Sequence, residues 1–236
     1  MTSGMLPALL RRYPATLVST VVVTITFILQ WFLPLVPLFE RDGAAIADGQ
    51  WWRILTSFVV QGSGWGQYIF NTLGLVLVGG AVERTRGTAW WLAAALAAQV
   101  VTSLIVLAWD PATRDSGSSL VVSGLVGVLT VTRFVAPAGW AAAAAGYRVF
   151  FVTYLLALAL GGPIAGAVIG SVVTGVTVSL LVRSRFATWS LTCVLVIVVA
   201  CAIGLAVVRD AHGVAVLVGL VVALVVGLIP PRRRPE

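Results

Sequence analysis

Long apolar runs separated by short polar segments make up most of the chain. About 20 consecutive apolar residues are needed for a helix to cross the hydrocarbon core of a bilayer, with a lower limit near 17. The pattern predicts eight crossing segments, at residues 15–38, 66–82, 88–109, 118–136, 147–162, 163–183, 188–208 and 211–229. The sequence therefore predicts an all-α polytopic membrane protein with eight transmembrane helices.

The weakest boundary between two predicted segments lies at Gly162-Pro163. Proline bends a helix as well as ending one, so residues 147–183 have the alternative of a single kinked helix. Such a helix would be longer than a bilayer is thick. We therefore expect a tight turn at this pair, with a separate helix on each side.

Composition supports lipid as the solvent of this chain. Hydrophobic residues make up 60% of it and charged residues only 10%, whereas soluble domains carry about 25% charged residues. The net charge of +7 comes from arginines scattered between the apolar runs, a distribution that argues against nucleic-acid binding. Cys193 and Cys201 lie in one apolar run without metal-ligand spacing, and we expect no metal and no cofactor.

The arginines also predict the orientation in the membrane. With eight spans and a cytoplasmic N-terminus, eleven arginines fall inside and four outside, as the positive-inside rule requires. The outside set is Arg41, Arg53, Arg114 and Arg209. We expect a multi-pass protein of the plasma (inner) membrane whose terminal segments, 1–14 and 230–236, are both cytoplasmic.

The chain has one histidine, His212, and it begins the last apolar segment. Gly117-Ser118-Ser119 opens another segment, and the predicted orientation puts both of these segment starts on the outer side. A serine needs a base within hydrogen-bond reach to act as a nucleophile, so Ser119 and His212 are candidate partners. Ser119 has the alternative of a simple helix cap, and Ser123 is a rival nucleophile one turn deeper.

Several motifs occur in a characteristic order along the chain: WRILTSF at 52–58, QYIFNTL at 67–73, GGAVER at 79–84, GSSLVVSGLVGVL at 117–129 and AHGVAVLVG at 211–219. In this order they resemble the rhomboid intramembrane serine proteases, with the core of the resemblance at 50–130 and 205–229 of a single membrane domain covering 1–236. The resemblance implies Ser119 as nucleophile and His212 as general base and acid. It further implies Asn71 and Gln67 as oxyanion donors, and membrane-protein substrates. Rhomboids use no third acidic residue, so Asp210 receives no role.

The chain departs from the rhomboid pattern at three positions. Leu120 replaces the glycine after the nucleophile, Gln67 replaces the first residue of the His-x-x-x-Asn motif, and Ser123 replaces a bulky aromatic residue. These departures favour the alternative of a pseudoprotease that binds membrane-protein clients without cleaving them. If the chain is a protease, we expect Leu120 to point away from the oxyanion side, into the interface with another helix.

A competing alignment places the last rhomboid helix at residues 162–170, which share its glycine spacing. Pro163 would then stand where the histidine belongs, and no Ser-His pair would exist. Our preferred alignment instead inserts two additional spans between the serine and histidine helices. Because a pair of spans returns the chain to the same side, His212 still emerges beside Ser119. A third reading, a small transporter, lacks the buried charge pairs and inverted repeats expected of one.

Overall fold

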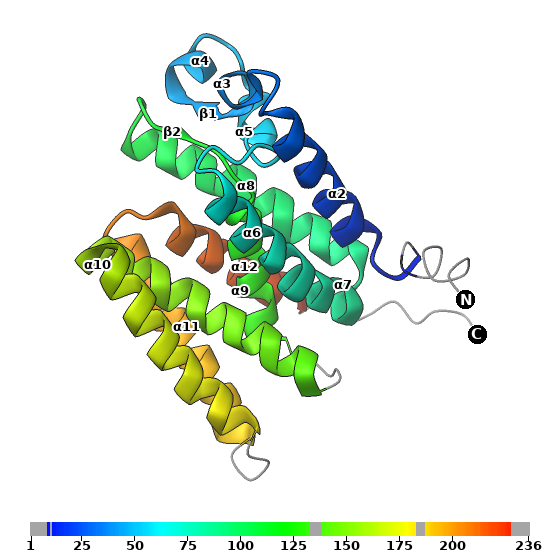
Figure 1. Cartoon of the computed structure of the whole chain (residues 1–236), viewed down its shortest axis with the longest axis vertical. Helices are drawn as coiled ribbons and strands as arrows, with labels where there is room; N and C mark the ends of the chain where they lie inside the picture. The colour runs from blue at the N-terminus through cyan, green and yellow to red at the C-terminus, as the bar shows by residue number, and fades with distance from the viewer. Residues whose placement is uncertain (1–8, 10, 133–137, 183–186, 228–236) are drawn as a thin grey trace.

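The computed structural model describes residues 9, 11–132, 138–182 and 187–227 (Figure 1). Its elements, in chain order, are α2 (Pro14–Leu29), α3 (Leu35–Phe39), β1 (Arg41–Asp42), α4 (Gly43–Ala47), α5 (Arg53–Thr56), α6 (Trp65–Gly74), the π-helical η1 (Leu75–Gly79), α7 (Gly80–Arg86), α8 (Thr88–Trp109), β2 (Arg114–Asp115), α9 (Ser119–Thr130), α10 (Ala138–Val182), α11 (Ala187–Val207) and α12 (Ala211–Gly227). The terminal segment 230–236 and most of 1–14 lie outside the described residues.

The predicted fold class is confirmed. Three helical stretches are long and apolar enough to cross a membrane, at Trp65–Arg86, Thr88–Trp109 and Gly139–Leu180, and four shorter helices are apolar as well. The third stretch contains Gly162, whose backbone is not helical (φ 81°, ψ −177°), so it forms two helices with a sharp turn between them. Three long stretches, one of them doubled, and four shorter helices match the eight predicted segments.

The predicted first segment, 15–38, was too long. Its helix, α2, ends at Leu29, and the chain then bends into the short α3. Pro34 has no N–H group to continue a helix, and the Gln30 side chain turns away to bond the backbone of Gln61. The helix predicted from 147 begins earlier, at Ala138, whereas the one predicted to reach 136 is helical only to Thr130.

The centre of the bundle is formed by α9 with α8 and α12 packed against it (Figure 1). Helices α9 and α12 run parallel, because Leu120 lies beside Ala211 and Ala215 while the next turns meet in the same order. A Cβ atom added to Gly219 would collide with the Gly124 carbonyl oxygen. Small residues therefore bring the two backbones into direct contact, as is common between transmembrane helices.

The two halves of α10 fold back on each other as a hairpin. Gly166 lies against Tyr154 and Gly170 lies against Phe150, so residues before and after the Gly162 turn run antiparallel. Helix α11 packs against this hairpin and against α12. In Figure 1, α10 and α11 lie on the far side of α9 and α12 from α2. The hairpin and α11 are thus the three helices between the serine and histidine helices.

Polar side chains fix the ends of the other helices. The buried Glu83 carboxylate accepts hydrogen bonds from the backbone N–H groups of Ala15 and Thr16, so it caps the start of α2. Arg53 donates to the Pro37 and Glu40 carbonyls in the loop between α2 and α6. Both side chains satisfy backbone groups that secondary structure leaves unpaired. In the rhomboid-like motifs, Glu83 and Arg53 therefore have structural roles.

Candidate active site

The start of α9 requires the glycine of its motif. Gly117 has φ 130°, a backbone conformation that side chains with a Cβ rarely adopt. A Cβ there would collide with Gln67 Nε2 and lie 3.3 Å from Asn71 Nδ2. The glycine thus allows two side-chain amides of α6 to approach the first turn of the helix that begins at Ser119, where backbone N–H groups lack helical partners.

Asn71 belongs to a chain of buried amide hydrogen bonds. Its Nδ2 donates to Gln61 Oε1 at 2.9 Å, and Gln61 Nε2 donates to Ser118 Oγ at 3.3 Å. The Gln61 backbone is held in turn by the side chain of Gln30, which bonds both its N–H and its C=O. An amide nitrogen carries two protons, so Asn71 has a second N–H group besides the one given to Gln61.

Gln67 holds the loop before the serine. Its Nε2 donates to the Ser116 carbonyl at 2.6 Å, and its Oε1 accepts from the Ser63 backbone N–H at 3.0 Å. Because Nε2 carries two protons, one N–H group of Gln67 remains unused by these bonds. Gln67 therefore combines a structural contact with one remaining donor near Gly117.

His212 is held by an acidic neighbour. Asp210 Oδ1 lies 2.8 Å from the ring atom Nδ1 and also accepts the His212 backbone N–H at 2.8 Å. The edge of the imidazole meets the Phe151 ring of α10 at 6.0 Å between centroids. Burial acts to raise the pKa of the Asp210 carboxyl, but hydrogen bonds and the charge of His212 outweigh it and lower that pKa.

Ser119 and His212 begin two adjacent parallel helices, at the same end of each. Within the described chain no hydrogen bond joins them, and Ser119 Oγ has no hydrogen-bond partner there. Resting active sites are often looser than reacting ones, so an unbonded pair is compatible with catalysis. The arrangement brings the candidate nucleophile and the candidate base to one end of the bundle, where no hydrogen bond joins them among the described residues.

The residues around Ser119 bear on one expectation and on one alternative of the sequence analysis. Leu120 is 2% exposed and packs against Ala98 of α8 and Ala215 of α12, so it points into a helix interface as predicted. Ser123 is fully buried, and its hydroxyl donates to the Ser119 carbonyl at 2.7 Å. Ser123 is therefore committed within its own helix, which weakens it as a rival nucleophile.

Two ion pairs connect the first loop to the segment before Ser119. The Arg41 guanidinium lies 3.0 Å from the Asp115 carboxylate, and Arg114 lies 2.9 Å from Asp42. The same residues pair as β1 and β2. Burial lowers the pKa of Arg41, although Asp115 opposes that shift. Because Asp115 lies four residues before Ser119, these two ion pairs, called the clamp below, lie close to the candidate site.

Sequence reasoning missed one residue of this end of the bundle, Gln61, and gave no role to a second, Asp210. Gln61 lies in a loop, and no spacing rule distinguishes a loop glutamine that bonds Asn71 from any other. A structural role for Asp210 was readable from the sequence, because an aspartate directly before a helix commonly caps it by accepting the N–H group two residues on. That geometry also brings the carboxylate to the side chain of the same residue, His212.

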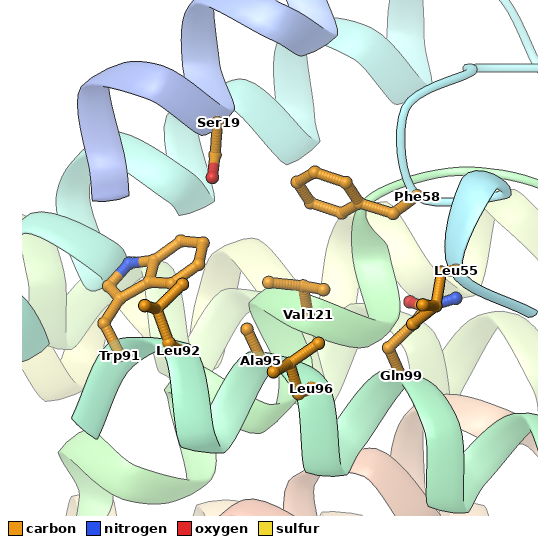
Figure 2. A pocket seen from close by; sticks show the side chains of 9 residues that line it. All are labelled: Ser19, Leu55, Phe58, Trp91, Leu92, Ala95, Leu96, Gln99 and Val121. Carbon is orange, nitrogen blue, oxygen red and sulfur yellow. The ribbon is translucent and has the colours of Figure 1, made fainter. Parts of the chain in front are cut away.

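A separate apolar groove of about 240 Å³ lies between α2 and α8. Figure 2 shows Ser19, Leu55, Phe58, Val121 and the α8 residues Trp91, Leu92, Ala95, Leu96 and Gln99 around it. Gln99 Nε2 donates to the Ile54 carbonyl and Ser57 Oγ, and its Oε1 has no partner among the described residues. The groove is lined by no acid or base, so it offers no acyl-transfer chemistry of its own.

The apolar helical bundle, with a serine and a histidine at one end of its central helices, defines a polytopic membrane protein with a candidate acyl-transfer site. The chain matches the rhomboid domain family over residues 48–185, more than half of its length. It therefore belongs to the rhomboid family and is an integral multi-pass membrane protein.

A curated relative is the rhomboid protease GluP of Bacillus subtilis (strain 168). The two are 37% identical over 95 residues, which is 40% of this chain and 18% of the relative. The chain thus spans less than a fifth of the length of that relative. The similarity is to one part of a larger protein.

The family match bears on the two alignments of the last rhomboid helix. It ends at residue 185, so it takes in the second half of α10 and leaves α12 outside. Packing favours the other alignment, because Gly219 of α12 meets the backbone of α9, whereas the nearest neighbours of Gly166 and Gly170 are Tyr154 and Phe150 of α10 itself. The range of the match and the packing of the helices thus point in different directions.

Proposed function

We propose that this chain is an intramembrane serine endopeptidase that cleaves peptide bonds in or near the transmembrane segments of other membrane proteins. Ser119 is the nucleophile, His212 the general base and acid, and Asn71 and Gln67 the side-chain oxyanion donors. The observation that carries the proposal is the parallel packing of α9 and α12, which starts the Ser119 and His212 helices at one end of the bundle.

In the proposed reaction, Ser119 Oγ attacks the carbonyl carbon of the substrate while His212 takes the hydroxyl proton. The carbonyl oxygen becomes an anion, and the remaining N–H groups of Asn71 and Gln67 and the first turn of α9 stabilise it. The C–N bond then breaks as His212 returns the proton to the leaving amine. Water, activated by the same imidazole, hydrolyses the acyl-serine and frees the enzyme.

A second candidate is a rhomboid pseudoprotease that binds membrane-protein clients without cleaving them. Two observations favour it: the family match ends before His212, and Ser119 and His212 share no hydrogen bond within the described residues. In this case the clients would occupy the same end of the bundle without undergoing chemistry.

The proposal includes an orientation of the chain in the membrane. We place the chain in the plasma membrane as one rhomboid-like domain with both terminal segments cytoplasmic and Ser119 near the outer surface. The arginine distribution supports this orientation. Cysteines introduced at Asp48 and Arg234 should react with membrane-impermeant thiol reagents from opposite sides. Reaction of both from the cytoplasmic side would contradict it.

Labelling by a fluorophosphonate, which reacts with activated serines, tests the choice between protease and pseudoprotease. The purified full chain in detergent should label, and Ser119→Ala should not. Ser118→Ala is the matched control, because Ser118 is the adjacent buried serine bonded to Gln61, and it should still label. Absence of labelling in the folded wild-type protein would favour the pseudoprotease.

A further inference from the structure

We propose that Asp210 is a positioning residue for His212, so that the site works as a Ser119–His212–Asp210 triad rather than a two-residue dyad. This inference rests on the proposed protease function and adds a group for which the rhomboid pattern has no counterpart. It is carried by the contact between Asp210 Oδ1 and His212 Nδ1 at 2.8 Å.

The contact determines which nitrogen of the ring is the base. An ionised carboxylate only accepts hydrogen bonds, so Nδ1 of His212 must carry the proton. In the neutral ring the lone pair is then on Nε2, the atom able to take a proton from a serine. A carboxylate on Nδ1 also stabilises the imidazolium that forms when the proton is transferred, which is the role of the acid in serine-protease triads.

The turn between α11 and α12 holds the backbone of Asp210 in place. The Asp210 backbone N–H bonds the Leu205 carbonyl at 2.8 Å, and Arg209 has φ 59°, an uncommon conformation for a residue with a side chain. Both side chains of the pair are largely enclosed, with 22% of His212 and 27% of Asp210 exposed. The Asp210 backbone is thus held by a contact that does not depend on His212, and its carboxylate is held by the backbone N–H and the ring of His212.

Other charges near the imidazole are those of the clamp. Asp115, from the segment before α9, and Arg41, from the first loop, act on His212 with opposite signs, and they are paired with each other. On α10 the neighbour is the uncharged Phe151. Among the described residues, Asp210 is therefore the acid in direct contact with the ring.

The alternative is that Asp210 only caps α12, since the same Oδ1 accepts the His212 backbone N–H. Two substitutions separate these roles. Asn and Ser are as effective as Asp at capping helices, but Asp210→Asn removes the charge, and the Ser side chain in Asp210→Ser is shorter. Asp110→Asn is the matched control, because Asp110 bonds the N–H of Ala112 two residues on in the same way.

The first measurement is NMR of the full chain in detergent, with labelled histidine. His212 is the chain's only histidine, so its signals need no assignment. In the wild type the neutral ring should carry its proton on Nδ1, and in Asp210→Asn the titration midpoint should move to lower pH because a stabilising negative charge is lost. An unchanged titration would overturn the inference whether or not the protein is a protease.

The second measurement is the rate of fluorophosphonate labelling of Ser119. Loss of the carboxylate from serine-protease triads lowers kcat by about 10⁴-fold, so Asp210→Asn and Asp210→Ser should label at least about tenfold more slowly. The Asp110→Asn control should label at the wild-type rate. Wild-type labelling rates in both Asp210 variants would mean that Asp210 only caps α12, and this result would overturn the triad. Absence of labelling in the wild type would instead be a failure of the proposed function.

Discussion

The α9–α12 pair and the α10 hairpin are both rich in regularly spaced glycines, yet they pack differently. Between α9 and α12, glycines meet backbone atoms: Gly127 faces the Val216 carbonyl, and Gly219 faces Gly124. Within α10 the approach is less close: a Cβ atom at Gly166 would lie 3.0 Å from the Tyr154 carbonyl oxygen, and one at Gly170 would lie 3.2 Å from the Phe150 ring. The backbones of α9 and α12 thus approach each other more closely at their glycines than the two halves of α10 do.

This difference bears on which helix completes the site. The tightly packed pair begins at Ser119 and His212, whereas the hairpin turns at Gly162-Pro163 without approaching α9 through its glycines. Glycine spacing in the sequence is similar in both places and does not separate them. The atoms that surround each glycine distinguish the two places, and they favour α12 as the partner of the serine helix.

The largest expected effect is on catalysis, at the end of the bundle where α9 and α12 begin. Asn71→Ala should lower kcat by about 10²–10³-fold, the cost of removing one oxyanion donor. The matched change in the hairpin is Thr177→Val, because within the described part of the chain that buried hydroxyl bonds Val173 of its own helix, and it should leave kcat unchanged. Cleavage of a reporter transmembrane substrate measures both. Equal losses would mean that Asn71 acts through folding rather than through the site.

The next effect is on stability. Gly219→Ala should lower the free energy of unfolding by at least about 1–3 kcal/mol, because the new Cβ collides with rigid backbone of α9. Gly170→Ala should cost less, since its Cβ would lie 3.2 Å from the Phe150 ring, which is able to shift. Thermal unfolding in detergent gives the ranking.

Gly175→Ala is the control for both glycine variants, because nothing lies within 4 Å of its Cβ position. Alanine there should be neutral or stabilise α10 by up to about 1 kcal/mol through helix propensity. If Gly219→Ala were tolerated as well as Gly175→Ala, the close contact between α9 and α12 would be wrong.

A smaller effect should follow from the residue that sequence reasoning missed. Gln61→Ala removes the acceptor of the Asn71 amide and the donor to Ser118, so Asn71 loses its orientation but not its N–H groups. One hydrogen bond is worth about 0.5–1.5 kcal/mol, so kcat should fall up to about tenfold. KM should stay near its wild-type value. A loss as large as that of Asn71→Ala would assign Gln61 to the oxyanion directly.

The sequence predicted the helices well because hydropathy and length determine which segments enter a bilayer. It also predicted the direction of Leu120 and the turn at Gly162. It overextended the first helix past Leu29, because the residues that follow are apolar although they bend into a separate short helix. Contacts such as Asn71 to Gln61 depend on how a loop folds over a helix, and single-sequence patterns carry no signal for that.

The most direct test of the account is the dependence of Ser119 labelling on the two candidate partners of its helix. His212→Ala should abolish fluorophosphonate labelling, because the serine loses its base. Pro163→Ala, at the position that the competing alignment gives to the histidine, should leave the labelling rate unchanged. Labelling that persists in folded His212→Ala would contradict the central claim that α9 and α12 together form the active site.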